Sequence, residues 1–210
     1  MAGIFITIEG PDGAGKSSQA TLLAEHLRDL GKSVVLTREP GGTRVGEGVR
    51  KVVLDLEGEG HTPVSDALLY NAARHQSVVE VIRPALERGD LVISDRYADS
   101  TLAYQGYGGG APLDELGAIQ RLTTGGLMPV RTVLIDVSVE DGLSRRHSGP
   151  AEGLNRFETS SLHGADFHQR VRDGYLEMAA ADPQRWRVVD GAADRDVVAA
   201  RVWAAVSDLF

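Results

Sequence analysis

One octapeptide limits the possible folds of this chain more than any other feature of its sequence. Residues 10–17 are Gly-Pro-Asp-Gly-Ala-Gly-Lys-Ser, which fits the pattern Gly, four residues, Gly, Lys, Ser or Thr. An apolar run over residues 4–9 precedes the octapeptide, and an amphipathic segment over residues 17–30 follows it. This order is typical of a strand, a glycine-rich loop and a helix whose N-terminus binds phosphate. The sequence therefore predicts a nucleoside triphosphate site near its N-terminus.

The residues of this loop supply what a polyphosphate needs. Glycines let the backbone wrap closely around an anion and point several N–H groups at it, and the helix N-terminus adds about half a positive charge. Lys16 is a point charge for the β- and γ-phosphates, and the Ser17 hydroxyl is placed to bind Mg²⁺. We expect ATP to bind at Gly10, Asp12, Gly13, Ala14, Gly15, Lys16, Ser17 and Ser18.

Short apolar runs alternate with helix-length amphipathic segments along the whole chain. Such runs suit strands that are buried on both faces of a parallel sheet. The alternation predicts an α/β fold, a doubly wound parallel five-stranded sheet flanked by helices, in a single domain over residues 1–210. The expected strands are Ile4–Glu9, Ser33–Thr37, Leu91–Ser94, Thr132–Val137 and Arg187–Val189. The expected helices are Ser17–Leu30, Ser65–Arg88 and Asp196–Leu209, with Pro84 as the point where the second would break.

Composition excludes several classes of function. The formal net charge is −8, whereas general nucleic-acid and acidic-membrane binding need a positive surface. The absence of cysteine excludes disulfides, cysteine-bound metals and a thiol nucleophile. No apolar run approaches the roughly 18 residues of a membrane span, and the N-terminus lacks the basic segment of a secretory signal. We expect a cytoplasmic protein that binds neither nucleic acid nor membrane.

The triphosphate site does not in itself identify a reaction. A GTPase would carry an Asn-Lys-x-Asp motif and a transporter ATPase a Leu-Ser-Gly-Gly signature, and the sequence contains neither. A kinase of a small acceptor is the leading hypothesis. The alternative outside the enzymes is a nucleotide-dependent switch or binding module, which would release no ADP in response to an acceptor.

Charged residues follow two of the expected strands. Arg38 comes directly after the second strand and is followed by Glu-Pro-Gly-Gly, a composition that forces a tight turn. Asp95 and Arg96 follow the third strand. Open α/β sheets bind ligands at the carboxyl ends of their strands. Arg38 therefore stands where a ligand would bind. Arg96 is a candidate for binding a phosphate and Asp95 for ordering Mg²⁺, directly or through water, with a structural ion pair within the Asp-Arg-Tyr triplet as the alternative.

Two pairs of side chains have helical spacing. Tyr70 and Arg74 are four residues apart and share one helix face. A ring beside a guanidinium suits a planar base, since stacking contributes roughly 1–3 kcal/mol per base. Thr101 and Gln105 repeat the spacing with groups that donate and accept hydrogen bonds, and Tyr104 lies between them. The pairs predict a base-binding site, with a core aromatic at Tyr70 and a solvated Gln105 as the alternatives.

Four blocks of sequence together resemble bacterial thymidylate kinase, and the resemblance extends over essentially the whole chain. The blocks are residues 5–18, Arg-Glu-Pro-Gly-Gly-Thr at 38–43, Asp-Arg-Tyr at 95–97 and Ser-Thr-Leu-Ala-Tyr-Gln-Gly at 100–106. The resemblance implies transfer of the γ-phosphate of ATP to the 5′-phosphate of dTMP, giving dTDP and ADP, with Mg²⁺ and in a homodimer. A kinase of another deoxynucleoside monophosphate, or of a deoxynucleoside, is the alternative.

The resemblance also implies how the phosphate and sugar of dTMP are bound. Arg38 and Arg96 would hold the 5′-phosphate. Asp12 would contact the acceptor sugar or help to order the metal bound at Ser17 and Asp95. Tyr104 would crowd the 2′ position and so favour deoxyribose.

The thymine base would be bound by the two helical pairs. Tyr70 stands where the family often has Phe and would stack on the ring. Arg74 would donate to a thymine carbonyl, and Thr101 and Gln105 would bind the remaining edge of the base.

The segment from about 145 to 164 is polar, rich in glycine and too long for an ordinary connection. Composition leaves two interpretations, a disordered surface loop or a short mobile lid. One branch of the family has a cation inside the phosphate loop, where this chain has Gly-Ala at residues 13–14. The resemblance therefore implies the branch that uses lid arginines, which contribute on the order of 10³–10⁵ in rate. The expected catalytic residues are Lys16, Arg96, Arg145, Arg146 and Arg156.

Overall fold

The computed structural model describes residues 3–54, 61–147 and 164–210. The side chains of Arg146 and His147, and residues 148–163 with Arg156 among them, lie outside this description, so most of the segment predicted as a lid does too. Within the described ranges, no helix combines the length and the apolar character that crossing a membrane requires.

Five parallel strands form one sheet in the order β2-β3-β1-β4-β5. The predicted doubly wound parallel sheet is confirmed, and each predicted strand lies within one residue of an observed one at both ends. The strands are β1 (Ile4–Glu9), β2 (Val34–Arg38), β3 (Leu91–Asp95), β4 (Arg131–Asp136) and β5 (Trp186–Asp190).

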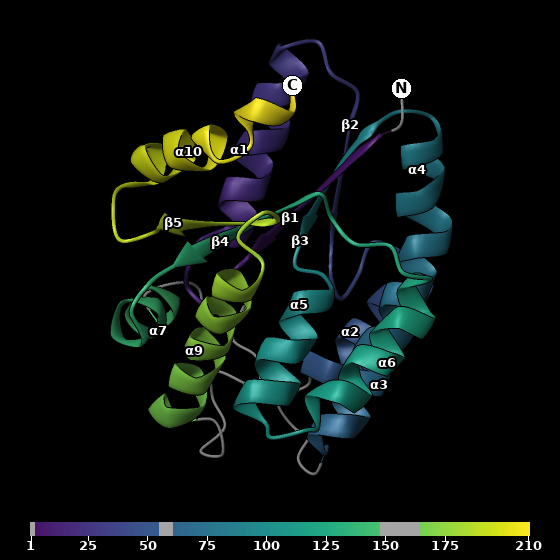
Figure 1. Cartoon of the computed structure of the whole chain (residues 1–210), viewed down its shortest axis with the longest axis vertical. Helices are drawn as coiled ribbons and strands as arrows, with labels where there is room; N and C mark the ends of the chain where they lie inside the picture. The colour runs from purple at the N-terminus through teal and green to yellow at the C-terminus, as the bar shows by residue number, and fades with distance from the viewer. Residues whose placement is uncertain (1–2, 55–60, 148–163) are drawn as a thin grey trace.

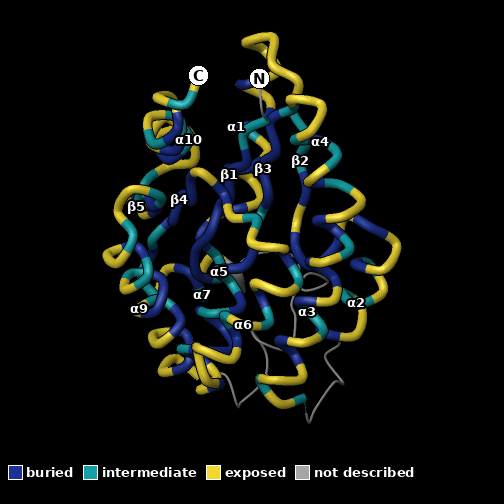
Figure 2. The backbone as a smooth tube through the Cα atoms, turned by 45° about the vertical axis from the view of Figure 1, so that its right-hand side comes forward, coloured by how far each residue is buried: buried dark blue, intermediate teal, exposed yellow. Residues whose placement is uncertain are grey.

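Alternate side chains of the central strands enter different cores. On one face, Ile6, Ile8 and Ile93 pack with residues of α1 (Lys16–Asp29) and α10 (Arg195–Ala204). On the other face, Phe5 and Val92 pack with a separate cluster. Figure 1 shows α1 and α10 together on one side of the sheet, and Figure 2 shows β1, β3 and β4 as buried strands. Burial on both faces explains why these strands are nearly continuous apolar runs in the sequence.

The other helices cover the second face and the carboxyl edge of the sheet (Figure 1). Two π-helical segments, Val78–Ile82 and Leu102–Gly108, continue α3 and α5, and a 3₁₀ turn at Ser207–Leu209 follows α10. The helices are α2 (Arg44–Leu54), α3 (Pro63–Ser77), α4 (Arg83–Glu87), α5 (Ala98–Thr101), α6 (Leu113–Thr124), α7 (Val139–His147) and α9 (Ala165–Ala181).

The expected break at Pro84 is wrong. The helix continues from α3 through the π-helical segment into α4, so helical backbone extends from residue 63 to residue 87. Pro84 lies in the first turn of α4, directly after the π-helical segment. The regular hydrogen-bond pattern is already interrupted there, so the missing proline N–H costs little.

The carboxyl ends of the strands meet at one edge of the sheet. β1 pairs with β3 on one side and with β4 on the other, whereas β2 follows it along the chain. The strand order therefore reverses beside β1, and the crevice at such a switch point is where open α/β sheets bind ligands. The glycine-rich loop follows β1 at this edge, and Arg38 and Asp95 are the last residues of β2 and β3.

Candidate active site

Two glycines shape the loop between β1 and α1. Gly13 has a φ of +75°, and a Cβ added there would lie 1.9 Å from the carbonyl oxygen of Gly142 in α7, so no larger residue fits. Gly15 precedes α1 with a φ of +85°, and a Cβ there would meet no atom within 4 Å. No side chain among the described residues caps α1. The loop thus packs tightly against α7, and the first N–H groups of α1 are available to an anion.

Lys16 lies in the first turn of α1 and is 7% exposed. Its Nζ donates a hydrogen bond to the carbonyl oxygen of Pro11 at 2.6 Å. Burial and the positive charge of Arg96 together lower the pKa of Lys16 to about 8, although the negative charges of Asp12 and Asp95 act in the opposite direction. A bound triphosphate would add negative charge beside the ammonium and so favour its protonated form.

Ser17 and Asp95, the two residues predicted to bind Mg²⁺, contact each other. The Ser17 hydroxyl donates a short hydrogen bond to Oδ2 of Asp95. The other carboxylate oxygen, Oδ1, is buried and has no hydrogen-bond partner in the described part of the chain. A buried carboxylate oxygen without a partner is costly, and Mg²⁺ prefers hydroxyl and carboxylate oxygens. No three His, Cys, Asp or Glu side chains among the described residues cluster to hold a metal, so the pair fits an ion that also takes phosphate and water oxygens.

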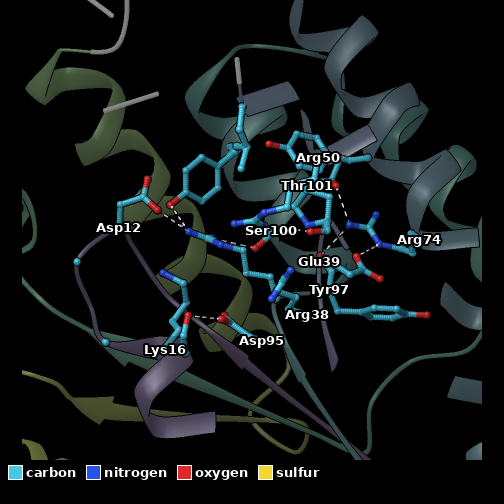
Figure 3. A pocket seen from close by; sticks show the side chains of 18 of the residues that line it. Asp12, Lys16, Arg38, Glu39, Arg50, Arg74, Asp95, Tyr97, Ser100 and Thr101 are labelled. Atoms are coloured by element: carbon cyan, nitrogen blue, oxygen red, sulfur yellow. Dashed lines mark hydrogen bonds and ion pairs between the residues drawn. The ribbon is translucent and has the colours of Figure 1, made fainter. Parts of the chain in front are cut away.

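A cavity of about 460 Å³ extends from the glycine-rich loop to α3 and α5. Figure 3 shows Asp12, Lys16 and Asp95 on one side of it and Arg74 and Thr101 on the other. Every residue predicted to bind the acceptor lines this cavity: Asp12, Arg38, Tyr70, Arg74, Arg96, Thr101, Tyr104 and Gln105. Six of the predicted ATP-binding residues also line it, namely Asp12, Gly13, Gly15, Lys16, Ser17 and Ser18.

Two members of the predicted ATP-binding set, Gly10 and Ala14, do not line the cavity. The methyl group of Ala14 packs instead into the core beneath the loop. Any contact of Ala14 with a nucleotide would therefore be made by its backbone.

Arg96 connects the phosphate loop with the helical side of the cavity. Its guanidinium donates to Oδ1 of Asp12 at 2.5 Å and to the hydroxyl of Tyr104 at 3.1 Å. Its Cζ lies 4.8 Å from the centre of the Tyr104 ring. Burial alone would raise the pKa of Asp12, but the positive charges of Arg96 and Lys16 lower it below its usual value. Asp12 therefore carries a negative charge that offsets the repulsion between Arg96 and Lys16 before any phosphate binds.

Arg74 is held by the protein at nearly all its donors. Its Nε donates to Glu39 at 2.7 Å, in an ion pair where both side chains are buried, and Nη1 donates to Asn71 at 3.1 Å. Nη2 donates to the carbonyl oxygen of Tyr97 and to the hydroxyl of Thr101. These contacts use four of the five N–H groups of a guanidinium. Arg74 is thereby fixed in orientation, and its fifth N–H group donates to no acceptor in the described part of the chain.

The cavity also contains residues that the sequence did not single out. Arg50 of α2 adds a cation, and its guanidinium donates to the carbonyl oxygen of Pro40 at 3.0 Å. Burial lowers the pKa of Arg50, and the charge of Arg38 lowers it further. No motif includes Arg50, whereas Glu39 stood inside the recognisable Arg-Glu-Pro-Gly-Gly-Thr block. The unforeseen lining residues are Glu39, Pro40, Arg50, Leu54, Tyr97 and Ser100.

Of the three arginines predicted for the lid, Arg145 lies among the described residues with its side chain. Arg145 lines the cavity and donates to the carbonyl oxygen of Gly191 at 2.9 Å. The side chain of Arg146 and the whole of Arg156 lie outside the described residues.

Glu9 is the last residue of β1 and is completely buried. Burial raises its pKa from 4.5 to about 7, and the nearby charge of Asp99 contributes to the rise. Hydrogen bonds from Ser100 and from the N–H group of Tyr97, and the charge of Arg96, act in the opposite direction.

Replacing Glu9 with glutamine should remove a pH dependence of stability. Between pH 4.5 and 7 the folded protein keeps a proton on Glu9 that the unfolded chain has lost. The free energy of unfolding should therefore fall as pH rises through this window, by up to about 1.4 kcal/mol per pH unit from this group. Urea titrations of both proteins at several pH values measure the effect. A difference between them that stays constant from pH 4.5 to 7 would contradict the raised pKa.

The chain resembles proteins of one known family in both sequence and fold. A family model described as thymidylate kinase matches residues 8–202. The thymidylate kinase of Thermomicrobium roseum is 50% identical over 206 residues, which cover 98% of this chain and 95% of that protein. The thymidylate kinase of Roseiflexus sp. is 48% identical over 210 residues, covering 97% and 93%. The crystal structure of the thymidylate kinase from Ehrlichia chaffeensis superimposes with a TM-score of 0.79 at 32% identity and covers both chains completely.

Proposed function

This chain belongs to the thymidylate kinase family, and on that premise we propose how its cavity transfers the γ-phosphate of ATP to the 5′-phosphate of dTMP. The products are ADP and dTDP. One observation carries the assignment of the site: a single cavity contains both the phosphate loop with Lys16 and the Tyr70–Arg74 pair. Donor phosphates and an acceptor base can therefore be bound at once, with the acceptor phosphate between them.

On the donor side, the N–H groups at the start of α1 bind the β- and γ-phosphates of ATP, together with the ammonium of Lys16. Lys16 releases the carbonyl oxygen of Pro11 and turns to the phosphates. Ser17 and Asp95 would hold Mg²⁺, directly or through water, and the charge neutralisation that such an ion supplies would act at the transferring phosphate. The unpartnered Oδ1 of Asp95 supports this assignment.

On the acceptor side, Arg38 and Arg96 hold the 5′-phosphate of dTMP, and Asp12 keeps Arg96 beside the loop. The Arg38 guanidinium is now paired with Glu47 at 2.9 Å, and its side chain is 54% exposed. An exposed pair of this kind contributes little to stability, so Arg38 can exchange Glu47 for a phosphate at small cost. Arg50, whose pKa is lowered by burial and by the charge of Arg38, lines the same cavity and supplies a third guanidinium.

The thymine base stacks on the ring of Tyr70 and is bound at its edge by Arg74, Thr101 and Gln105. Arg74 has one N–H group to offer, and its contact with Thr101 orients that hydroxyl as well. Tyr104 lies against Arg96, and its ring excludes a ribose 2′-hydroxyl.

The chemistry needs no general base. The second ionisation of a phosphate monoester lies near pH 6, so the acceptor is already a dianion and a nucleophile at neutral pH. What opposes the reaction is repulsion between two polyanions and the loss of their alignment. The cations Lys16, Arg38 and Arg96 reduce the first, and the rigid walls of the cavity reduce the second.

The function is tested by ADP production with ATP, Mg²⁺ and each deoxynucleoside monophosphate in turn. We expect dTMP to have the highest kcat/KM. An enzyme that uses dAMP or dGMP as well as dTMP would contradict the proposal, and one that releases no ADP with any acceptor would support a nucleotide-dependent switch instead. A panel of unphosphorylated deoxynucleosides completes the comparison.

Replacing Tyr70 with alanine should weaken the binding of dTMP by about ten- to a hundredfold, since stacking of a base on an aromatic ring contributes roughly 1–3 kcal/mol. The affinity for ATP should change by less than about twofold, and Tyr70→Phe should bind dTMP as the unchanged protein does. Calorimetric titrations with each nucleotide measure both values. Equal losses for dTMP and ATP in a stable Tyr70→Ala protein would count against stacking.

We further propose that the protein is a cytoplasmic homodimer. Exposed apolar side chains on α2, α3 and α6 support a dimer, because these helices pack together and carry Val52, Leu68 and Leu122, which are 48%, 53% and 80% exposed. Light scattering at micromolar concentration should give the mass of two chains.

A further inference from the structure

The buried carboxyl group of Glu9 contacts residues that surround Arg96. Glu9, at the end of β1, has none of its side chain exposed and accepts hydrogen bonds at both oxygens. Oε1 accepts from the backbone N–H of Tyr97 at 2.7 Å. Oε2 is 2.6 Å from the hydroxyl of Ser100 and 2.9 Å from that of Tyr175. Glu9 thus joins β1 to α5 and α9.

The two hydroxyls that bind Glu9 also face the guanidinium of Arg96. Nη1 of Arg96 is 3.2 Å from Ser100 Oγ and 3.5 Å from the Tyr175 hydroxyl. The two hydroxyl oxygens lie 2.8 Å apart. One nitrogen of Arg96 therefore rests on a pair of hydroxyls whose positions are set by one carboxyl group.

Glu9 acts on the backbone of Arg96 as well. Arg96 has a φ of +70°, a left-handed conformation that costs a residue with a Cβ about 1–2 kcal/mol. Three hydrogen bonds hold it there. The N–H of Arg96 donates to the carbonyl oxygen of Ile8 at 3.0 Å, the carbonyl of Arg96 accepts from Ser94 Oγ at 2.7 Å, and the next N–H, of Tyr97, donates to Glu9.

We propose that Glu9 is a positioning residue for Arg96. It holds the left-handed backbone of Arg96 through Tyr97 and the guanidinium through Ser100 and Tyr175. Arg96 therefore has its binding orientation before the acceptor phosphate arrives. The inference rests on the proposed function, in which Arg96 binds the 5′-phosphate of dTMP. Glu9 itself touches no substrate, since it does not line the cavity.

The number of protons shared by Glu9, Ser100 and Tyr175 determines which replacement of Glu9 should preserve its positioning role. Glu9 Oε2, Ser100 Oγ and the Tyr175 hydroxyl make three mutual contacts of 2.6–2.9 Å. The two hydroxyls supply two protons, so all three contacts are hydrogen bonds only when Glu9 also carries one. Glutamine has the same shape, accepts at Oε1 and donates at Nε2. Leucine keeps the volume but makes none of these bonds.

The first experiment compares Glu9→Leu with Glu9→Gln. Glu9→Leu should raise KM for dTMP about tenfold or more, the loss expected when several buried hydrogen bonds are removed together, and change KM for ATP less than about twofold. Glu9→Gln should recover most of this loss. The matched control is Thr7→Val, which removes a buried hydrogen bond to Thr132 from the same strand away from the site; it should lower stability and leave both KM values unchanged.

The second experiment is a double-mutant cycle with Arg96→Ala, measured as the dissociation constant of dTMP. Glu9→Leu should raise the dissociation constant of dTMP by some factor in the unchanged protein. Because Glu9 acts through Arg96, that factor should be at least five times smaller when Arg96 is already alanine. Effects that add, or a Glu9→Leu protein with normal KM for dTMP, would overturn the inference.

If Glu9→Leu does not fold, Ser100→Ala and Tyr175→Phe replace it in the same cycle, and additive effects from both would overturn the inference equally. The outcome is separable from that of the proposed function. An unchanged protein that phosphorylates other monophosphates as well as dTMP refutes the function, whereas a dTMP kinase with an additive cycle refutes only the role of Glu9.

Discussion

Lys16→Met is expected to lower kcat with ATP and dTMP by about 10²–10³, the loss usual when a preorganised group that stabilises developing charge is removed. Methionine fills a similar volume but has no charge. The mutation also removes the hydrogen bond to Pro11 and a cation that lowers the pKa of Asp12. The affinity for dTMP should change less than about threefold, because Tyr70, Arg74 and the acceptor arginines remain.

Single-turnover transfer with both substrates saturating measures the chemical step directly. The chain contains three lysines, and Lys32, exposed in the turn between α1 and β2, provides the control: Lys32→Met should transfer phosphate at the normal rate. A Lys16→Met protein with an unchanged single-turnover rate would remove Lys16 from the catalytic role.

Arg96→Ala is expected to lower kcat/KM for dTMP by about 10²–10³, since truncating one member of a buried, hydrogen-bonded charge pair costs roughly 2–5 kcal/mol and the Arg96–Asp12 pair is largely buried. Two effects combine here. The acceptor phosphate loses the guanidinium that we propose binds it, and Asp12 loses the cation at 2.5 Å that lowers its pKa. Arg96→Lys should recover little, because an ammonium cannot reach Asp12, Tyr104 and a phosphate together.

The left-handed backbone at Arg96 provides a second measurement. Arg96→Gly should be more stable than Arg96→Ala by about 0.5–1 kcal/mol, because glycine adopts a φ of +70° without strain, although both proteins lack the guanidinium. The control is Arg88→Ala, whose exposed arginine pairs with Asp90 just before β3, far from the carboxyl ends of the strands. Normal kcat/KM for dTMP in Arg96→Ala would refute the phosphate-binding role.

The fold was predictable because its determinants are local. Each strand is a short apolar run, and the alternation of strands and helices predicts a parallel sheet. The strand order β2-β3-β1-β4-β5 comes from the structure. The predicted helix break at Pro84 is wrong because the outcome at that position is not determined by the proline itself. A single proline predicts a break, but whether the helix continues depends on the turn before it, and the π-helical segment at Val78–Ile82 has no signature in the sequence.

The candidate site was predictable wherever its residues belong to a motif or a helical spacing. Lys16, Ser17 and Asp95 follow strands, and the carboxyl ends of parallel strands meet at one edge of the sheet. Tyr70 and Arg74 are four residues apart, and helical periodicity places these two on one face. Arg50 belongs to neither kind of pattern, and the packing of α2 against α3 is what brings it to the cavity.

The amino-acid sequence alone determines the parallel α/β architecture, the triphosphate loop and the family, because each depends on residues that are close to one another along the chain. Tertiary structure decides how the cations are held. The partners of Arg96 include Asp12 and Tyr175, and those of Arg74 include Glu39 and Thr101, residues up to 84 positions away from them along the chain. Hydrogen bonds and buried charges depend on distances of a few ångströms, and only the packed fold sets these distances.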